Sequence, residues 1–242
     1  MQKITMQIKI IAVGSSKWEM FLCRWGISYL IDQDLLFDTF GDPYVFLRNA
    51  ESLNIDFSKI RHIVISHDHW DHISGLWYII NRYKDINVYI CPNFDTKIKE
   101  RMRSFGMNVA EVKGLLGIKD NIYSTGEIEG SFRNISISEQ ALVVNSENGL
   151  IVITGCAHPG ILTILKEVKK NFPDKEIFCA LGGFHLLDKK RKEIELIVSE
   201  FKGMGIKKVG PTHCSGKIAE EIFKKQYREN FIPINSKETI EI

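Results

Sequence analysis

Apolar residues along this chain follow two different spacings. Short runs rich in β-branched residues, at 8–13, 63–65 and 177–181, predict buried strands. The stretches 161–172 and 193–201 instead repeat apolar residues every three or four positions, which predicts helices. Because strands and helices alternate, the pattern favours an α/β fold in which helices cover the faces of sheets.

One order of elements occurs twice along the chain. The apolar runs 28–31 and 35–37 flank a polar turn and precede a helix and a strand, and the runs 141–144 and 150–153 do the same around a turn that ends in Asn-Gly. Such hairpins predict mixed rather than purely parallel sheets. We therefore predict an αββα sandwich, with mixed sheets inside and helices outside, as a single domain of residues 1–242 built from two pseudo-repeated halves, about 1–130 and 131–242.

Two further segments have distinct patterns. Asp42 and Pro43 precede a stretch with apolar residues on one face, which predicts a helix capped by Asp42 and ending before Asn54. Residues 92–135 fit the repeat poorly. There we expect one helix at 96–105 and otherwise connecting loops, including the Gly-rich passage 114–130.

Composition narrows the classes of protein. With 32 Lys and Arg against 30 Asp and Glu, the formal net charge is +2, which gives no general attraction to nucleic acid or to an anionic membrane. No apolar run approaches the roughly 18 residues that span a bilayer, and the N-terminus lacks a cleavage-site pattern. The five cysteines form no CxxC pair, which is typical of reduced thiols. We expect a cytoplasmic protein with no membrane or nucleic-acid partner.

The motif His67-Asp68-His69-Trp70-Asp71-His72 places three imidazoles and two carboxylates directly after a predicted strand. A strand end followed by a turn can present two groups of ligands to two adjacent points, as a dinuclear metal site requires. Imidazole nitrogens and carboxylate oxygens suit zinc, iron or manganese, and the lack of thiolates in the motif disfavours a closed structural zinc site. The alternative is that these side chains cap a helix or bind backbone groups.

Other histidines end predicted elements in the second half. His158 follows one apolar strand, while His185 and His213 end two others. If the two halves pack sheet to sheet, the loops that carry these residues can converge with the one that carries His67. Cys156 and Cys214 are close to two of these histidines in sequence, and their role stays open between packing, thiolate ligation and redox sensitivity.

These segments resemble a known family. The motif at 67–72 resembles the HxHxDH signature of the metallo-β-lactamase superfamily, and residues 35–39 resemble its first motif. The segments 154–160, 182–186 and 211–216 are similar to a branch of small metal-dependent hydrolases that includes dihydropterin ribofuranosyl-aminobenzene phosphate synthase-like proteins. The similarity extends over nearly the whole chain.

The resemblance implies two divalent metal ions, with zinc expected first and manganese or iron as alternatives. It also implies that Asp38 lies behind the ligands and orients them by hydrogen bonds. One ion would be held by His67, His69 and His158, and the other by Asp71, His72 and His213.

The chain departs from the family pattern at one point. Many members carry an aspartate that bridges the two metals at the end of the strand corresponding to 177–181, whereas this strand ends in Gly182-Gly183-Phe184-His185. Asp188 is the nearest carboxylate in sequence. We therefore leave three roles open for His185: metal ligand, proton donor to a leaving group, or stabiliser of negative charge.

These implications predict an enzyme, a metal-dependent hydrolase that uses metal-activated water on a phosphate-containing or ester substrate, a small and anionic molecule. Asp71 and His185 would be the catalytic residues, with Asp71 taking up the proton of the water and His185 supporting the departing group. One alternative is a transferase of the dihydropterin ribofuranosyl-aminobenzene phosphate synthase type, acting on a pterin diphosphate. Another is a non-catalytic protein that binds or senses metal. The oligomeric state is left open.

Overall fold

The computed structural model describes residues 7–241 and divides the chain into two compact units. The first unit comprises the residues up to Ile90, Phe94–Glu111 and the residues from Asn235 onward, and the second comprises Cys91–Asn93 and Val112–Ile234. The division into halves near residue 130 stays a prediction.

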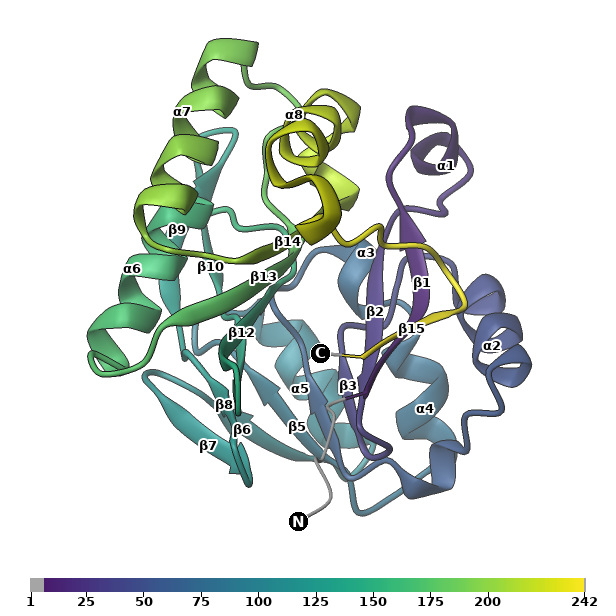
Figure 1. The fold of residues 1–242 in the computed structure, drawn as a ribbon. Helices are drawn as coiled ribbons and strands as arrows, with labels where there is room; N and C mark the ends of the chain where they lie inside the picture. The colour runs from purple at the N-terminus through teal and green to yellow at the C-terminus, as the bar shows by residue number, and fades with distance from the viewer. Residues whose placement is uncertain (1–6, 242) are drawn as a thin grey trace. The chain divides into compact units, whose positions relative to one another are not determined.

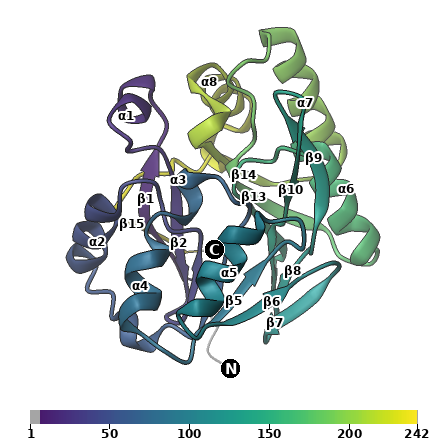
Figure 2. The ribbon, with the colours of Figure 1, turned by 180° about the vertical axis from the view of Figure 1, so that it is seen from behind.

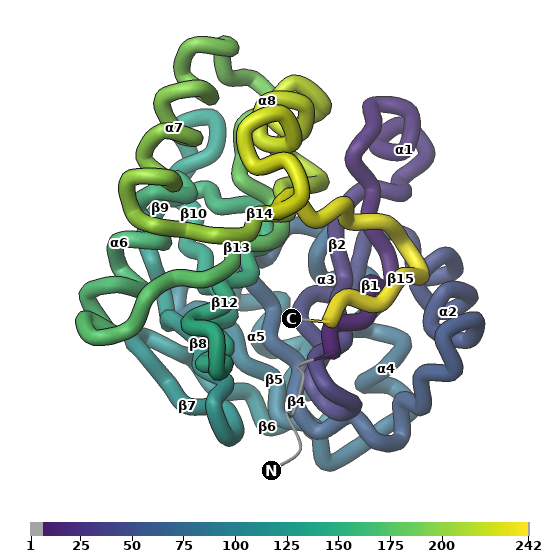
Figure 3. The backbone as a smooth tube through the Cα atoms, viewed as in Figure 1, coloured from purple at the N-terminus to yellow at the C-terminus, as the bar shows by residue number. Residues whose placement is uncertain are grey.

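The first unit contains a seven-stranded mixed sheet in the order β15-β1-β2-β3-β4-β5-β6 (Figure 1). Pairing is antiparallel from β15 to β3 and parallel from β3 to β6. Figure 3 shows the C-terminal segment running beside β1, where β15 forms an edge of this sheet. The strands are β1 (Gln7–Gly14), β2 (Gly26–Ile31), β3 (Leu35–Phe37), β4 (His62–Val64), β5 (Asn87–Ile90), β6 (Asn108–Glu111) and β15 (Glu238–Glu241).

Helices of the first unit form where the sequence supplies caps and an apolar face. Asp42 accepts hydrogen bonds from the backbone N–H groups of Tyr44 and Val45 and Pro43 opens α2, which confirms the predicted start. Helices α4 and α5 lie along one face of the sheet (Figure 2). The helical segments are α1 (Lys17–Phe21), α2 (Pro43–Ser52), η1 (Phe57–Lys59), α3 (Trp70–Ile73), α4 (Leu76–Arg82) and α5 (Thr96–Ser104).

The second unit contains a six-stranded mixed sheet in the order β14-β13-β12-β11-β8-β7 and a separate hairpin. The strands β12, β13 and β14 are parallel neighbours, whereas β11, β8 and β7 pair antiparallel. The sheet consists of β7 (Leu116–Lys119), β8 (Ile122–Ser124), β11 (Leu142–Ser146), β12 (Gly149–Thr154), β13 (Ile177–Gly183) and β14 (Lys208–Thr212), and the hairpin of β9 (Ile128–Phe132) and β10 (Ile135–Glu139).

Three helices bury their apolar faces against this sheet. Ile164 of α6, Val198 of α7 and Phe223 of α8 belong to one buried cluster together with Val143 and Val152 of the strands. The helical segments are α6 (Ile161–Asn171), α7 (Arg191–Gly203), η2 (His213–Ser215), α8 (Lys217–Tyr227) and η3 (Arg228–Asn230).

The predicted repeat is visible in the order of elements. An antiparallel hairpin, a helix and a strand parallel to the second hairpin strand occur as β2-β3-α2-β4 and again as β11-β12-α6-β13. The prediction of loops between 114 and 130 was wrong, because β7, β8 and part of β9 lie there. Their glycine and charged residues hide the apolar alternation, since much of β7 and β9 is exposed on both faces.

The structure also bears on the state of the cysteines and on the length of the helices. All five cysteines are free thiols, as predicted. None of the helices within residues 7–241 has the length and hydropathy required to cross a bilayer.

Candidate metal centre

In the first unit, two residues separate the end of β4 from the start of the histidine motif. His67 follows the strand, His69 is the N-cap of α3, and Asp71 and His72 lie in the first turns of that helix. Thr39, which follows β3, fixes the helix because its backbone N–H and its hydroxyl both donate to the carbonyl of His72, at 2.8 and 2.9 Å. The motif therefore folds at the carboxyl ends of two parallel strands, an edge where open α/β sheets commonly bind ligands.

The motif presents two pairs of donor atoms. Nε2 of His67 lies 3.1 Å from Nδ1 of His69, and Nε2 of His72 lies 3.3 Å from Oδ2 of Asp71. Neighbouring ligands of a tetrahedral zinc ion, each about 2.0–2.1 Å from the metal, are about 3.3 Å apart. Both pairs thus fit two ligands of one ion, without rearrangement of the motif.

The opposite sides of the rings are held by a buried hydrogen-bond network. Asp38 accepts from the backbone N–H of Ser66 at 2.7 Å, from its hydroxyl at 2.8 Å and from Nδ1 of His72 at 2.6 Å. The Ser66 hydroxyl, having donated to Asp38, accepts from Nδ1 of His67 at 2.8 Å. The network therefore assigns the Nδ1–H tautomer to both rings and leaves each Nε2 lone pair available to a metal.

Charge at this position also favours a cation. Burial alone would lower the pKa of His72, but the carboxylates of Asp71 and Asp38 outweigh burial and raise this pKa well above its ordinary value. Burial raises the pKa of the Asp38 carboxyl, and the interactions with His72 and Ser66 oppose that shift only in part. Two buried carboxylates around one imidazole thus stabilise positive charge, whether it is carried by a proton or by a metal ion.

In the second unit, the loop after β12 is fixed by a carboxylate. Glu139, fully buried at the end of β10, accepts from the backbone N–H groups of Cys156 and Ala157 at 2.7 and 2.8 Å. Its other oxygen accepts from the N–H of His158 at 2.8 Å and lies 3.0 Å from Nδ1 of that ring. Glu139 thus orients the His158 imidazole, with Nε2 as the nitrogen left for a ligand.

His185 and His213 follow the neighbouring strands in strained backbone conformations. Ala157, His185 and His213 have φ values of 63°, 53° and 53°, a region that costs non-glycine residues free energy and often marks functional loops. The ring centroid of His185 lies 4.6 Å from that of His158 and 5.6 Å from that of Phe132. Within the described residues, Nδ1 of His185 is buried and has no hydrogen-bond partner.

We expect the Glu139→Gln variant to lower the free energy of unfolding by about 1.5–3 kcal/mol, because an amide in place of the carboxylate turns one acceptor into a donor that faces N–H groups. Chemical denaturation of both proteins measures the difference. The matched control is Glu129→Gln on the exposed side of β9, which should change stability by less than about 0.5 kcal/mol. Equal effects of both substitutions would contradict the role of Glu139.

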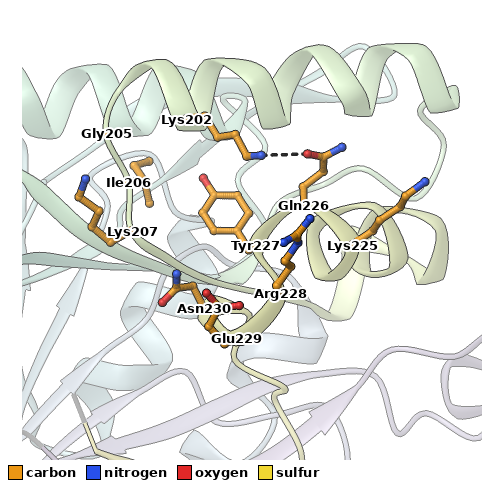
Figure 4. A pocket seen from close by; sticks show the side chains of 10 residues that line it. All are labelled: Lys202, Gly205, Ile206, Lys207, Lys225, Gln226, Tyr227, Arg228, Glu229 and Asn230. Atoms are coloured by element: carbon orange, nitrogen blue, oxygen red, sulfur yellow. Dashed lines mark hydrogen bonds between the residues drawn. The ribbon is translucent and has the colours of Figure 1, made fainter.

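The second unit contains a hollow of about 510 Å³ between α7 and the end of α8 (Figure 4). The residues that line it are not the metal donors described above. Lys202 donates to the side-chain oxygen of Gln226 at 2.8 Å there, and burial raises the pKa of Tyr227 to about 12. None of the predicted ligands lines this hollow. The hollow is therefore separate from the candidate metal centre.

Comparison with known proteins shows what this chain resembles in sequence and in fold. Residues 28–135 match the model of the metallo-β-lactamase superfamily. The solved structure of Tm1679, a metal-dependent hydrolase of the β-lactamase superfamily, aligns with a TM-score of 0.80 at 29% identity over 98% of this chain and 99% of that chain. The chain is therefore similar to the metallo-β-lactamase superfamily in sequence over residues 28–135 and in fold over nearly its whole length. The predicted α/β fold with mixed sheets and helices is thus confirmed.

Two further proteins that are similar to this chain differ in what they show. The chain is 28% identical, over an alignment of 260 positions and 87% of each protein, to the 7,8-dihydropterin-6-methyl-4-(beta-D-ribofuranosyl)-aminobenzene-5'-phosphate synthase of Methanocaldococcus jannaschii. A diphosphatase from the PhnP family aligns with a TM-score of 0.62 over 99% of this chain and 98% of that chain. At 14% identity, this second likeness concerns the fold alone.

The structure gives a physical reason for the departure from the metallo-β-lactamase pattern at the end of β13. A Cβ atom on Gly182 would lie 2.1 Å from the carbonyl oxygen of Thr154, and one on Gly183 would lie 2.3 Å from that of Gly155. Phe184 is buried in the core, and Asp188 is exposed. This backbone therefore leaves no space for an aspartate at either glycine.

We expect the Gly183→Ala variant to be destabilised by about 1–3 kcal/mol, because the added methyl group would overlap the Gly155 carbonyl and would lie 2.7 Å from Sγ of Cys214. Gly203→Ala, at the end of α7, is the control, because no atom other than its chain neighbours and the backbone of its own helix lies within 4 Å of its Cβ position. That variant should be neutral or stabilised by up to about 1 kcal/mol. Chemical denaturation measures both, and a stability of Gly183→Ala equal to that of the wild type would show that the strand end has room for a side chain.

The structure brings together the predicted residues within each unit. Asp38 and the motif at 67–72 form one network in the first unit, whereas His158 and His185 are neighbours in the second. Binding of metal by these residues and by His213 stays a prediction. Sequence reasoning missed Ser66 and Glu139. Glu139 ends β10, much as Asp38 directly follows the end of β3, but β10 was not among the predicted strands.

Proposed function

We propose that this protein is a metal-dependent hydrolase of a phosphate-containing ester or diphosphate. The observation that carries the proposal is the pair of donor sets in the motif, with Nε2 of His67 and of His72 both made available by hydrogen bonds on the far side of each ring. Similarity to the metallo-β-lactamase superfamily and to the metal-dependent hydrolase Tm1679 supports it further. The proposed ligands are His67, His69 and His158 for one ion and Asp71, His72 and His213 for the other, with zinc expected first.

Each residue has its own role in the proposed reaction. A divalent ion bound there would lower the pKa of water from about 15.7 towards 7 and polarise an oxygen of the substrate. Asp71, buried beside His72, orients the attacking water and accepts its proton. His185, half-buried after β13, donates a proton to the departing oxygen. Asp38 and Glu139 keep the imidazoles in the required tautomer and orientation.

A second candidate function is a synthase reaction. It is favoured by 28% identity, over 87% of both chains, to the dihydropterin ribofuranosyl-aminobenzene phosphate synthase of Methanocaldococcus jannaschii. In that reaction a pterin diphosphate would lose its diphosphate to an attacking group of the second substrate instead of to water. The same ligands and the same proton donor would serve the departure of the diphosphate.

One experiment separates these candidates. The protein is stripped with a chelator and reloaded in turn with Zn²⁺, Mn²⁺ and Fe²⁺, and each form is assayed with phosphate monoesters, phosphate diesters and diphosphate esters. In parallel, mass spectrometry follows a dihydropterin diphosphate incubated with an aminobenzene ribosyl phosphate. We expect turnover that disappears with chelation and returns with metal.

The outcomes are distinct. Release of phosphate or alcohol by the reloaded protein supports hydrolysis, and a coupled product of the two substrates replaces that proposal with the synthase reaction. The Asp71→Asn variant, purified identically, shows whether residual turnover comes from a contaminating phosphatase. No turnover by any reloaded form, in either assay, would remove both candidates and leave binding or sensing of metal.

A further inference from the structure

A second kind of ligand set lies entirely within the second unit. Cys156 follows β12, His185 follows β13 and Cys214 follows β14, three strands that are parallel neighbours in the sheet. One ligand atom from each residue, the two sulfur atoms and a ring nitrogen, lies within 4.8 Å of the other two. This set differs from the motif at 67–72 because two of its three donors are thiols.

Hydrogen bonds fix the backbone around these donors and link the three loops to one another. The backbone N–H of Cys156 donates a hydrogen bond to the carboxylate of Glu139. The carbonyl of Cys156 accepts a hydrogen bond from Sγ of Cys214 at 3.3 Å. The carbonyl of Cys214 in turn accepts from the N–H groups of Leu186 and Leu187, at 3.1 and 3.0 Å, which ties it to the loop of His185. The three donors are therefore held together before any ligand arrives.

The sulfur of Cys214 occupies space that a side chain at position 183 would otherwise fill. A side chain at position 183 would place its Cβ 2.7 Å from that sulfur, so glycine at the end of β13 keeps the position open. Cys156 and Cys214 are 4% and 6% exposed, while His185 is only half-buried. An ion can thus reach the set from the side of His185 and be enclosed by the two sulfur atoms.

The distances suit a thiophilic ion. In a tetrahedral zinc site with Zn–S of about 2.3 Å and Zn–N of about 2.0–2.1 Å, two sulfur atoms are about 3.8 Å apart and a sulfur and a nitrogen about 3.5 Å. A set already within 4.8 Å needs each distance between two donors to shorten by about 1.3 Å or less, which side-chain rotation supplies. Two cysteines and a histidine also leave one position of the tetrahedron for water or another ligand.

We propose that Cys156, His185 and Cys214 form a site for one thiophilic divalent ion such as Zn²⁺, distinct from the ligands of the proposed hydrolase. Binding at this site ties together the loops that follow β12, β13 and β14, and so fixes the loops that carry His158 and His213. When the site holds an ion, His185 would bind it through one ring nitrogen, and the N–H of the other would support a departing oxygen by a hydrogen bond in place of a proton.

Cobalt tests the site in the full-length protein, because thiolate ligation of Co²⁺ gives intense near-ultraviolet charge-transfer absorption that imidazole and carboxylate ligation do not. The reduced, metal-free protein is titrated with Co²⁺ under argon. We expect this absorption to saturate in the wild type at the intensity of one thiolate-bound ion per chain, whatever Co²⁺ the other ligands take up. It should fall to background in Cys156→Ser and in Cys214→Ser. His185→Gln should keep the band but weaken binding at least tenfold.

The matched control is Cys179→Ala, which removes a buried thiol of β13 outside this set and should keep the full absorption. Circular dichroism confirms that each variant is folded. A second measurement needs only the wild-type protein. Zn²⁺ should slow the alkylation of Cys156 and Cys214, which mass spectrometry of peptides follows. The exposed Cys23 should react at an unchanged rate.

Absence of the thiolate absorption in the wild type, or its persistence in both serine variants, would overturn the proposal. So would a disulfide between Cys156 and Cys214 in protein kept under argon with Zn²⁺, since oxidised sulfur cannot ligate the ion. None of these readouts depends on turnover. Loss of hydrolysis with the thiolate absorption intact therefore counts only against the proposed function.

Discussion

The Asp71→Asn variant is expected to lose roughly 10²–10⁴-fold in kcat/KM for metal-dependent hydrolysis. The amide has nearly the shape of the carboxylate, but it carries no negative charge and cannot accept the proton of the attacking water. Asp71 is also one of two buried carboxylates beside His72, so its loss weakens the attraction of this position for a cation. Steady-state kinetics on metal-reloaded protein measures the first effect, and metal content after gel filtration measures the second.

Asp68→Asn is the control for this prediction, because it makes the same chemical change in the same motif. The Asp68 carboxylate accepts from the backbone N–H of Asp95 at 2.9 Å and so holds the start of α5 rather than the donor sets. Its kcat/KM should stay within a few-fold of the wild type. If Asp71→Asn retained wild-type turnover and metal content, Asp71 would be neither ligand nor base, and the division of roles proposed for the motif would be wrong.

Much of the fold follows from local pattern. The hairpins at 28–37 and 142–153 and the helices α2, α6 and α7 were predicted because their apolar spacing and caps act over a few residues. The strands β7 and β9 were missed because exposed strands carry no apolar face to mark them, and their pairing depends on partners distant in sequence. Burial against a second element, rather than propensity, decides such segments.

In the candidate site, too, the features that depend on neighbouring residues could be predicted and those that depend on distant residues could not. The motif at 67–72 could be predicted because its donors are adjacent in sequence, and Asp38 came with the family resemblance. Glu139 and the set of Cys156, His185 and Cys214 could not, because their residues lie on different strands and meet only through the register of β12, β13 and β14 and the end of β10. A sequence records which side chains are present but not which strand ends are neighbours.

The Asp38→Asn variant is expected to bind metal at the His72 position about 10–100-fold more weakly. The reason is the tautomer of His72. If the amide nitrogen takes the place of Oδ2, it donates to Nδ1 of His72, so the proton moves to Nε2 and that nitrogen loses the lone pair needed for a metal. If the amide turns over, its nitrogen faces the N–H of Ser66 instead, and two donors oppose each other. Neither orientation satisfies both partners.

The same substitution is expected to lower the free energy of unfolding of the metal-free protein by about 3–5 kcal/mol, since it removes one partner of a fully buried ion pair. Isothermal titration with Zn²⁺ measures the affinity, and chemical denaturation measures the stability. Asp42→Asn is the control, because Asp42 caps α2 at the surface and asparagine caps a helix equally well. Wild-type zinc affinity in a folded Asp38→Asn protein would show that the tautomer of His72 is set by a group other than Asp38, and the buried network would then have a structural role alone.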